Sequence, residues 1–143
     1  MSARLSTHDL STALRIAVAR LSRRLRAEKE DHELSDAQTA TLGYLAREGS
    51  GTIGRLSEYE RVKPPSMNRT VNHLEEAGYV ERTADAADGR KVVVVLTERG
   101  TRLVAETRKR RDAWLHQRLA GLSPEQRATL AAAAEIMREI ADS

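Results

Sequence analysis

The polar side chains with the clearest chemical purpose lie between residues 63 and 76. In a helix, at about 100° per residue, Arg69 and Asn72 fall on one face and Asn68 and His73 flank it. Guanidinium, amide and imidazole groups are forked donors and acceptors, the groups that pair with base edges in the major groove of DNA. This face therefore predicts contact with double-stranded DNA.

The helix that would present this face is predicted from its start, its apolar stripe and its end. Pro64 and Pro65 suit the first helical positions, where the missing N–H of proline is not needed. Gly78 is the residue type that commonly follows a last helical turn. A buried stripe follows from apolar residues at spacings of four, three and three, namely Met67, Val71, Leu74 and Ala77.

A β-hairpin is predicted directly after this helix. Residues 79–83 and the β-branched run 90–96 are predicted as strands, joined by a polar, turn-rich loop. Arg82, Arg90 and Lys91 place positive charge at the mouth of the hairpin. Taken alone, each of Arg69, Asn72 and Arg90 is as consistent with a solvated surface as with DNA. A recognition helix followed by a basic hairpin is a winged helix, and the arrangement as a whole favours DNA.

Two further helices are predicted to position the recognition helix. Ser35 and Gln38 have the spacing of a capping box, and Gly49 ends the helix that they begin. Thr52 begins a short helix, and residues 61–63 form a three-residue turn into the next one. Two helices joined by such a turn make a helix-turn-helix, whose second helix enters the DNA groove.

Long amphipathic helices are predicted at both ends of the chain. In the first, which Ser6 or Thr7 caps, apolar residues recur every three or four positions until residues 31–33 interrupt the pattern. Thr97 begins a second long helix, and Ser123 caps the last one with another capping-box signature. Because a monomer has little to cover these stripes, we expect a two-fold dimer in which the terminal helices of two copies interlock.

The composition excludes several classes of protein. The 143 residues are 40% hydrophobic and 31% charged, with a formal net charge of +3, as in an ordinary globular domain. Cysteine is absent, which excludes disulfides, thiolate metal sites and cysteine nucleophiles. No apolar run approaches the roughly 20 residues of a membrane span, and the start has no apolar signal-peptide core. We therefore expect one cytoplasmic domain with no membrane partner.

The chemistry of an enzyme is not indicated. Residues 49–54, Gly-Ser-Gly-Thr-Ile-Gly, match a dinucleotide-binding pattern, but that pattern needs a preceding strand, and a helix is predicted there. A helix stop and restart is the better interpretation. No Ser/His/Asp or carboxylate pair can be argued, and we expect no cofactor and no metal; only a zinc site assembled across a dimer stays open. The histidines are scattered without paired ligand spacing: His8, His32, His73 and His116.

The chain resembles the MarR family of winged-helix repressors over nearly its whole length. The resemblance implies a single domain, residues 1–143, that is mainly α with a small β-hairpin wing. Its winged helix-turn-helix lobe would span about 35–97, flanked by dimerisation helices at about 6–33 and 98–142. Five motifs in order and spacing carry the resemblance: Leu34-Ser35-x-x-Gln38, Val62-x-Pro64-Pro65-Ser66-Met67, Leu74-Glu75-x-x-Gly78-Tyr79-Val80, Asp88-x-Arg90 and Leu96-Thr97-x-x-Gly100.

The resemblance also implies how DNA is bound. The two recognition helices of a homodimer would enter successive major grooves of a pseudo-palindromic operator, and each wing would place Arg90 in a flanking minor groove. Asp88 would position Arg90 by a charge-assisted hydrogen bond. The residues expected to contact DNA are Lys63, Pro65, Ser66, Asn68, Arg69, Asn72 and His73 in the recognition helix, and Asp88, Arg90 and Lys91 in the wing.

Regulation is implied as well. The family usually takes small aromatic or phenolic anions in a crevice between the dimerisation helices and the DNA-binding lobe. A change in the angle between the lobes would then release the operator. Residues of suitable type for such a ligand are Arg15, Arg20, Tyr44 and Trp114, although core packing explains Tyr44 and Trp114 equally well.

Lys63 departs from the family pattern, which often has Ser or Thr before this proline. A lysine cannot accept the N–H bonds of the first turn, and its charge opposes the helix dipole. Either Ser66 and the prolines compensate, or Lys63 contacts a phosphate, which we favour.

The sequence favours a ligand-responsive repressor, and two other binding functions stay open. A DNA-coating protein would show a steep salt dependence with little sequence preference. A winged helix that binds proteins would not need Arg69, Asn72 and Arg90 to point the same way.

Overall fold

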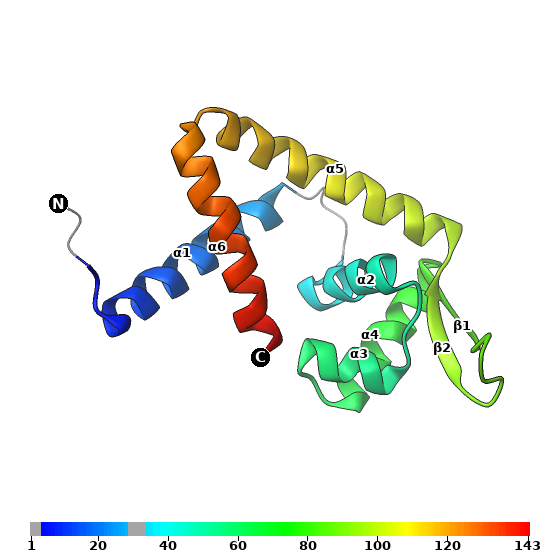
Figure 1. Cartoon of the computed structure of the whole chain (residues 1–143). Coiled ribbons are helices and arrows are strands. Elements are labelled where there is room, and N and C mark those ends of the chain that lie inside the picture. The colour runs from blue at the N-terminus through cyan, green and yellow to red at the C-terminus, as the bar shows by residue number, and fades with distance from the viewer. Residues whose placement is uncertain (1–3, 29–33) are drawn as a thin grey trace. The chain divides into compact units, whose positions relative to one another are not determined.

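The computed structural model describes residues 4–28 and 34–143 (Figure 1). Residues 31–33, which were expected to interrupt the first helix, lie outside the described residues. Two compact units are formed, the winged lobe (Asp31–Arg108) and the terminal-helix unit, which comprises the N-terminal helix and Lys109–Ser143. The elements in order are α1 (Thr7–Ala27), α2 (Asp36–Glu48), α3 (Ile53–Glu60), α4 (Pro64–Glu76), β1 (Val80–Ala84), β2 (Val92–Leu96), α5 (Glu98–Ala120) and α6 (Pro124–Asp142).

Serine and threonine side chains begin the helices at the predicted positions. Ser35 and Ser123 each form a reciprocal capping box with the glutamine three residues later. Ser6 and Thr52 each accept a backbone N–H from the first turn of α1 and α3, at 3.1 Å in both cases. Each bond satisfies an N–H that has no partner within the helix. These caps confirm the predicted starts of four helices.

The hairpin strands pair in simple antiparallel register. They begin one and two residues later than predicted, because the residues before each strand are engaged elsewhere. The N–H of Tyr79 donates to the carbonyl of Leu74 at 2.9 Å and so still belongs to the end of α4. The N–H of Lys91 donates to the carbonyl of Asp88 at 3.0 Å and so belongs to the turn.

Gly51 explains the glycine-rich run at residues 49–54. Its N–H and C=O exchange hydrogen bonds with Val94 at 3.1 and 2.8 Å, which adds a short bridge to the outer side of β2. A Cβ at Gly51 would lie 3.2 Å from side-chain atoms of Leu56 and Tyr44. The run connects the end of α2 to the first turn of α3. Its second glycine, Gly51, lets the side chains of Tyr44 and Leu56 pack closely against the backbone. The interpretation as a helix stop and restart is confirmed.

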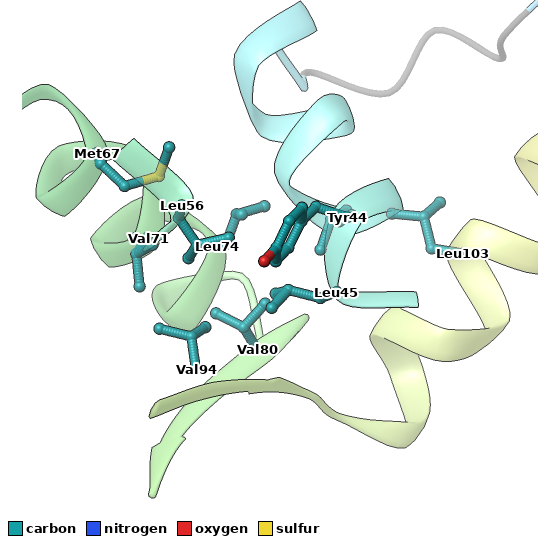
Figure 2. Close-up of a cluster of buried hydrophobic side chains, with 10 residues drawn as sticks. Tyr44, Leu45, Leu56, Met67, Val71, Leu74, Val80, Val94 and Leu103 are labelled. Atoms are coloured by element: carbon teal, nitrogen blue, oxygen red, sulfur yellow. The ribbon is translucent and has the colours of Figure 1, made fainter. Parts of the chain in front are cut away.

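The core of the winged lobe is formed by apolar side chains from α2, α3, α4, both strands and the start of α5 (Figure 2). Leu56, Val71 and Leu74 have no exposed surface. Full burial of such a side chain contributes about 1.5–3 kcal/mol. Met67, Val71 and Leu74 are the buried face of α4, as predicted, whereas Ala77, the fourth member of the predicted stripe, is the C-cap and only partly buried. The opposite face of α4 is directed away from the core.

A junction of hydrogen bonds joins the start of α5 to the end of α4. The Thr97 hydroxyl donates to the carbonyl of Gly78 at 2.6 Å and accepts the N–H of Gly100 at 3.1 Å. The N–H of Thr97 donates to the carbonyl of Tyr79 at 3.1 Å. A Cβ at Gly100 would lie 2.0 Å from that same carbonyl oxygen, so this approach needs glycine. The first turns of α5 therefore belong to the winged lobe.

The terminal-helix unit has a different character. Neither α1 nor α6 contains a fully buried residue. Trp114 of α5 is partly buried, with the guanidinium groups of Arg24 and Arg118 at 4.7 and 5.4 Å from its ring centroid. None of the described helices is long and apolar enough to cross a membrane. The large apolar side chains that stay exposed on α1 and α6 include Leu10, Leu14, Ile16, Val18, Leu21, Leu130, Ile136 and Ile140.

Candidate nucleic-acid interface

Helices α3 and α4 are joined by a turn that centres on Arg61. This residue has a positive φ of 55°, the left-handed conformation that ends many helices. Its N–H donates to the carbonyl of Glu58 at 3.2 Å, and the N–H of Val62 donates to the carbonyl of Ser57 at 3.0 Å. These bonds end α3 and reverse the chain. The predicted helix-turn-helix is confirmed, with α4 as its second helix.

The start of α4 has no capping side chain. Lys63 stands at the N-cap and makes no side-chain cap bond. Pro64 and Pro65 have no N–H to satisfy, and the carbonyl of Lys63 accepts the N–H groups of Ser66 and Met67 at 3.0 and 3.2 Å. The two prolines therefore leave fewer N–H groups that need a side-chain cap. A phosphate contact by the exposed Lys63 stays a prediction.

The predicted reading face of α4 is accessible. Arg69 lies along the helix and donates from Nη2 to the Ser66 hydroxyl at 3.2 Å. His73 lies with Nδ1 at 3.5 Å from Nε2 of Gln38, which joins the face to the start of α2. Both contacts order side chains without burying them. The exposed members of the predicted set are Lys63, Pro65, Asn68, Arg69, Asn72 and His73, whereas Ser66 is half-buried.

Arg82 does not project from the mouth of the hairpin as the sequence suggested. Its Nη1 donates to Oε1 of Glu75 at 3.0 Å, and its Nη2 donates to Oδ1 of Asn72 at 2.8 Å. Its backbone N–H donates to Oε2 of Glu75 at 3.2 Å. Sequence reasoning missed this group because its members are seven and ten residues apart, across a change from helix to strand. The side chain of Arg82 connects β1 to α4 and is bound to both of these partners.

The tip of the wing extends away from the helices of the winged lobe and carries three exposed polar residues (Figure 1). Oδ1 of Asp88 accepts the backbone N–H of Arg90 at 3.1 Å. We expected Asp88 to hold the guanidinium of Arg90, but within the described chain no ion pair joins these two side chains, and the bond goes to the backbone instead. Asp88 therefore shapes the turn, and the guanidinium of Arg90 is left for another partner, as is the exposed Lys91.

Two of the four residues of suitable type for an effector, Tyr44 and Trp114, serve packing in their own units. Tyr44 is buried in the core of the winged lobe and packs on Tyr59, with ring centroids 4.7 Å apart. Trp114 packs under two arginines of the terminal-helix unit. Arg15 and Arg20 are exposed on α1. These packing roles match the alternative interpretation of Tyr44 and Trp114, and none of the four is assigned to an effector.

The side chains that could bind a metal ion are the histidines and the carboxylates. Within residues 4–28 and 34–143, no three His, Asp or Glu side chains gather as a metal site would require. His73 lies beside Gln38, and His8 and His116 are exposed. His32 lies outside the described residues.

Comparison with known proteins gives a consistent result. A family model described as the MarR family matches residues 32–91. The HTH-type transcriptional regulator MT0903.1 of Mycobacterium tuberculosis is 41% identical over 133 residues, which is 93% of both chains. A MarR family protein from Bacillus stearothermophilus superposes with a TM-score of 0.83 at 24% identity, over 95% of both chains. BpsR of Bordetella bronchiseptica, whose DNA binding is regulated by 6-hydroxynicotinic acid, superposes with a TM-score of 0.71 at 22% identity, over 99% of both chains. The predicted winged-helix fold class is confirmed.

Proposed function

This chain belongs to the MarR family of transcriptional regulators, and we propose that it acts as a homodimeric repressor on a pseudo-palindromic operator, from which a small molecule releases it. The observation that carries the proposal is the exposed outer face of α4, where Arg69 and Asn72 lie opposite the buried stripe. The hydrogen-bond donors and acceptors of these side chains match those of base edges in the major groove. The two side chains are exposed and take no part in the packing of the core.

The wing supports the same proposal. The guanidinium of Arg90 stands on a hairpin tip that a hydrogen bond from its own backbone to Asp88 holds in shape. An arginine presented in this way suits a narrow minor groove, where it responds to groove width and negative potential more than to base identity. Helix α4 would then supply sequence readout, while Arg90, Lys91 and Lys63 would supply sequence-independent attraction.

The terminal helices support the homodimer. Helices α1 and α6 expose large aliphatic side chains, among them Leu10 at 51%, Ile136 at 57% and Ile140 at 59% of their full surface. Apolar surface of this extent on a helix pair is typical of an interface between subunits. Two recognition helices about 34–36 Å apart, one turn of DNA, would then meet successive major grooves.

The proposal includes release by a small aromatic acid. In BpsR a ligand of this chemical class regulates DNA binding, and the two chains share their fold over almost their whole length. A ligand that changes the angle between two lobes alters the spacing of the recognition helices and lowers operator affinity by rigid-body rotation. A repressor of this kind needs no catalytic residue, cofactor or membrane contact, and we place it in the cytoplasm.

The test is a fluorescence-anisotropy titration of the protein onto the DNA upstream of its own gene and onto a scrambled duplex, at two salt concentrations. We expect tight binding to the upstream DNA and weak, salt-sensitive binding to the scrambled duplex. Equal, salt-sensitive binding to both would favour a DNA-coating protein. Absence of binding to either duplex would favour a winged helix that binds proteins.

The contribution of single side chains sharpens this test. Arg69→Ala is expected to weaken operator binding by roughly 1–3 kcal/mol and to relax preference at one base position. Arg90→Ala is expected to weaken binding to all sequences and to flatten the salt dependence. Affinities equal to that of the parent for both variants would remove these residues from the interface.

A further inference from the structure

We propose that Arg82 determines which base edge Asn72 recognises, because it holds the side-chain amide of Asn72 in one orientation. The inference rests on the proposed function, since it concerns how α4 reads an operator. It gives a positioning role to a residue of β1 and requires no contact between Arg82 and DNA.

The geometry fixes Arg82 at several points. Glu75 accepts two hydrogen bonds from it, one from Nη1 at 3.0 Å and one from the backbone N–H at 3.2 Å. The Nη2 of the same guanidinium donates to Oδ1 of Asn72 at 2.8 Å. Because the guanidinium is planar and its two terminal nitrogens bond to different residues of α4, rotation away from one partner would also disturb the other.

This contact settles the orientation of the amide. A guanidinium has donors only, so the amide atom of Asn72 that faces Arg82 is the oxygen. With Oδ1 engaged, the Nδ2 end of the amide is turned away from Arg82, and Asn72 is exposed on the predicted reading face. Asn72 therefore meets a partner mainly as a hydrogen-bond donor.

The orientation of the amide decides which base fits. An asparagine that is free to present both ends pairs with adenine, since it accepts from N6 and donates to N7. An amide that offers donors suits an edge made of acceptors, and guanine presents two of them in the major groove, N7 and O6. The structure thus favours guanine over adenine at the base that Asn72 contacts.

A lysine at position 82 separates this role from simple support of the fold. Its ammonium could keep the ion pair with Glu75, but a single charged nitrogen lacks the planar fork that reaches a second residue. We expect Arg82→Lys to keep the thermal midpoint of the protein near that of the parent. The amide of Asn72 would be released in the same variant.

The experiment is selection from a random-sequence duplex library, followed by sequencing, with the full chain at one salt concentration. The parent is expected to enrich a motif that includes a guanine, and Asn72→Ala is expected to abolish that preference. At this same position, Arg82→Lys and Arg82→Met are expected to lower the preference for guanine over adenine about tenfold, with the other positions unchanged. Arg102→Met is the matched control, because it removes a surface ion pair with Glu98 at 3.3 Å in the same lobe and should alter no position.

The outcomes separate the inference from the function on which it rests. An unchanged guanine preference in both Arg82 variants overturns the inference, and so does an equal loss of affinity for every sequence. A parental motif that survives Asn72→Ala also overturns it, and leaves the proposed function standing. A parent chain that enriches no sequence overturns the proposed function and the inference together. If Arg82→Met fails to fold, Arg82→Lys decides alone.

Discussion

The winged lobe and the terminal-helix unit use the same aliphatic residues in opposite ways. In the winged lobe, Leu56, Val71 and Leu74 have no exposed surface, whereas Ile136 and Ile140 of α6 keep more than half of theirs, at 57% and 59%. The lobe closes its core within one chain. The terminal helices carry stripes that one chain does not cover, so their stability is expected to depend on a second copy.

The variant with the largest expected effect tests whether the difference in burial between the two units is also a difference in stability. Leu74→Ala empties space in a closed core and is expected to lower the free energy of unfolding by about 2–5 kcal/mol, measured by urea denaturation. Ile140→Ala is the matched variant on α6, and at low protein concentration we expect it to cost well under 1 kcal/mol. Equal losses in both variants would mean that the two units are packed alike, and would end the comparison.

The contact between the start of α5 and the end of α4, inside the winged lobe, is expected to show the next largest effect. A Cβ at Gly100 would lie 2.0 Å from the carbonyl oxygen of Tyr79, so Gly100→Ala must displace α5 from the hairpin. We expect a loss of about 1–3 kcal/mol in thermal or urea unfolding. Gly54→Ala is the control, because the nearest atom to its Cβ is 3.9 Å away and alanine is the better helix former. If Gly100→Ala leaves the free energy of unfolding unchanged, this contact does not fix the position of α5 against the hairpin.

Local patterns in the sequence predicted much of this fold. The capping serines, the two prolines of α4 and its apolar stripe act within one helix, so their meaning does not depend on the rest of the chain. The bonds from Arg82 to Asn72 and Glu75, and the approach of Gly100 to Tyr79, join residues that only the folded chain brings together. Residue types alone showed a basic hairpin, but could not show that one of its arginines is directed to the helix beside it.

The proposed dimer allows a third test of the contrast between the units. Ile136→Glu places a charge on the exposed stripe of α6, and a charge that is buried without a partner at an interface is strongly unfavourable. We expect sedimentation velocity to show dimer for the parent and a shift toward the 15.9 kDa monomer for the variant, with tenfold or greater weakening of association.

The control for this variant lies in the other unit. Val92→Glu adds the same charge on the hairpin of the winged lobe, at a position of similar exposure, 60% against 57% for Ile136. It should leave the association constant unchanged. A monomeric parent at micromolar concentration, or equal effects of both substitutions, would remove the terminal helices from the proposed interface.

The smallest expected effect separates folding from binding within the winged lobe. Lys63→Ser introduces a residue that usually caps helices, but Pro64 and Pro65 have no N–H to satisfy and the carbonyl at position 63 already accepts from Ser66. The free energy of unfolding should therefore change by less than about 0.5 kcal/mol.

If Lys63 contacts a phosphate, affinity falls equally for operator and scrambled DNA, and the slope of log affinity against log salt falls by about 0.9 per protomer. Lys109→Ser removes the same charge from the terminal-helix unit and should leave the salt slope at the parental value. A loss confined to the operator would instead make Lys63 part of base readout, and the chemistry at the start of α4 would then resemble that of its outer face.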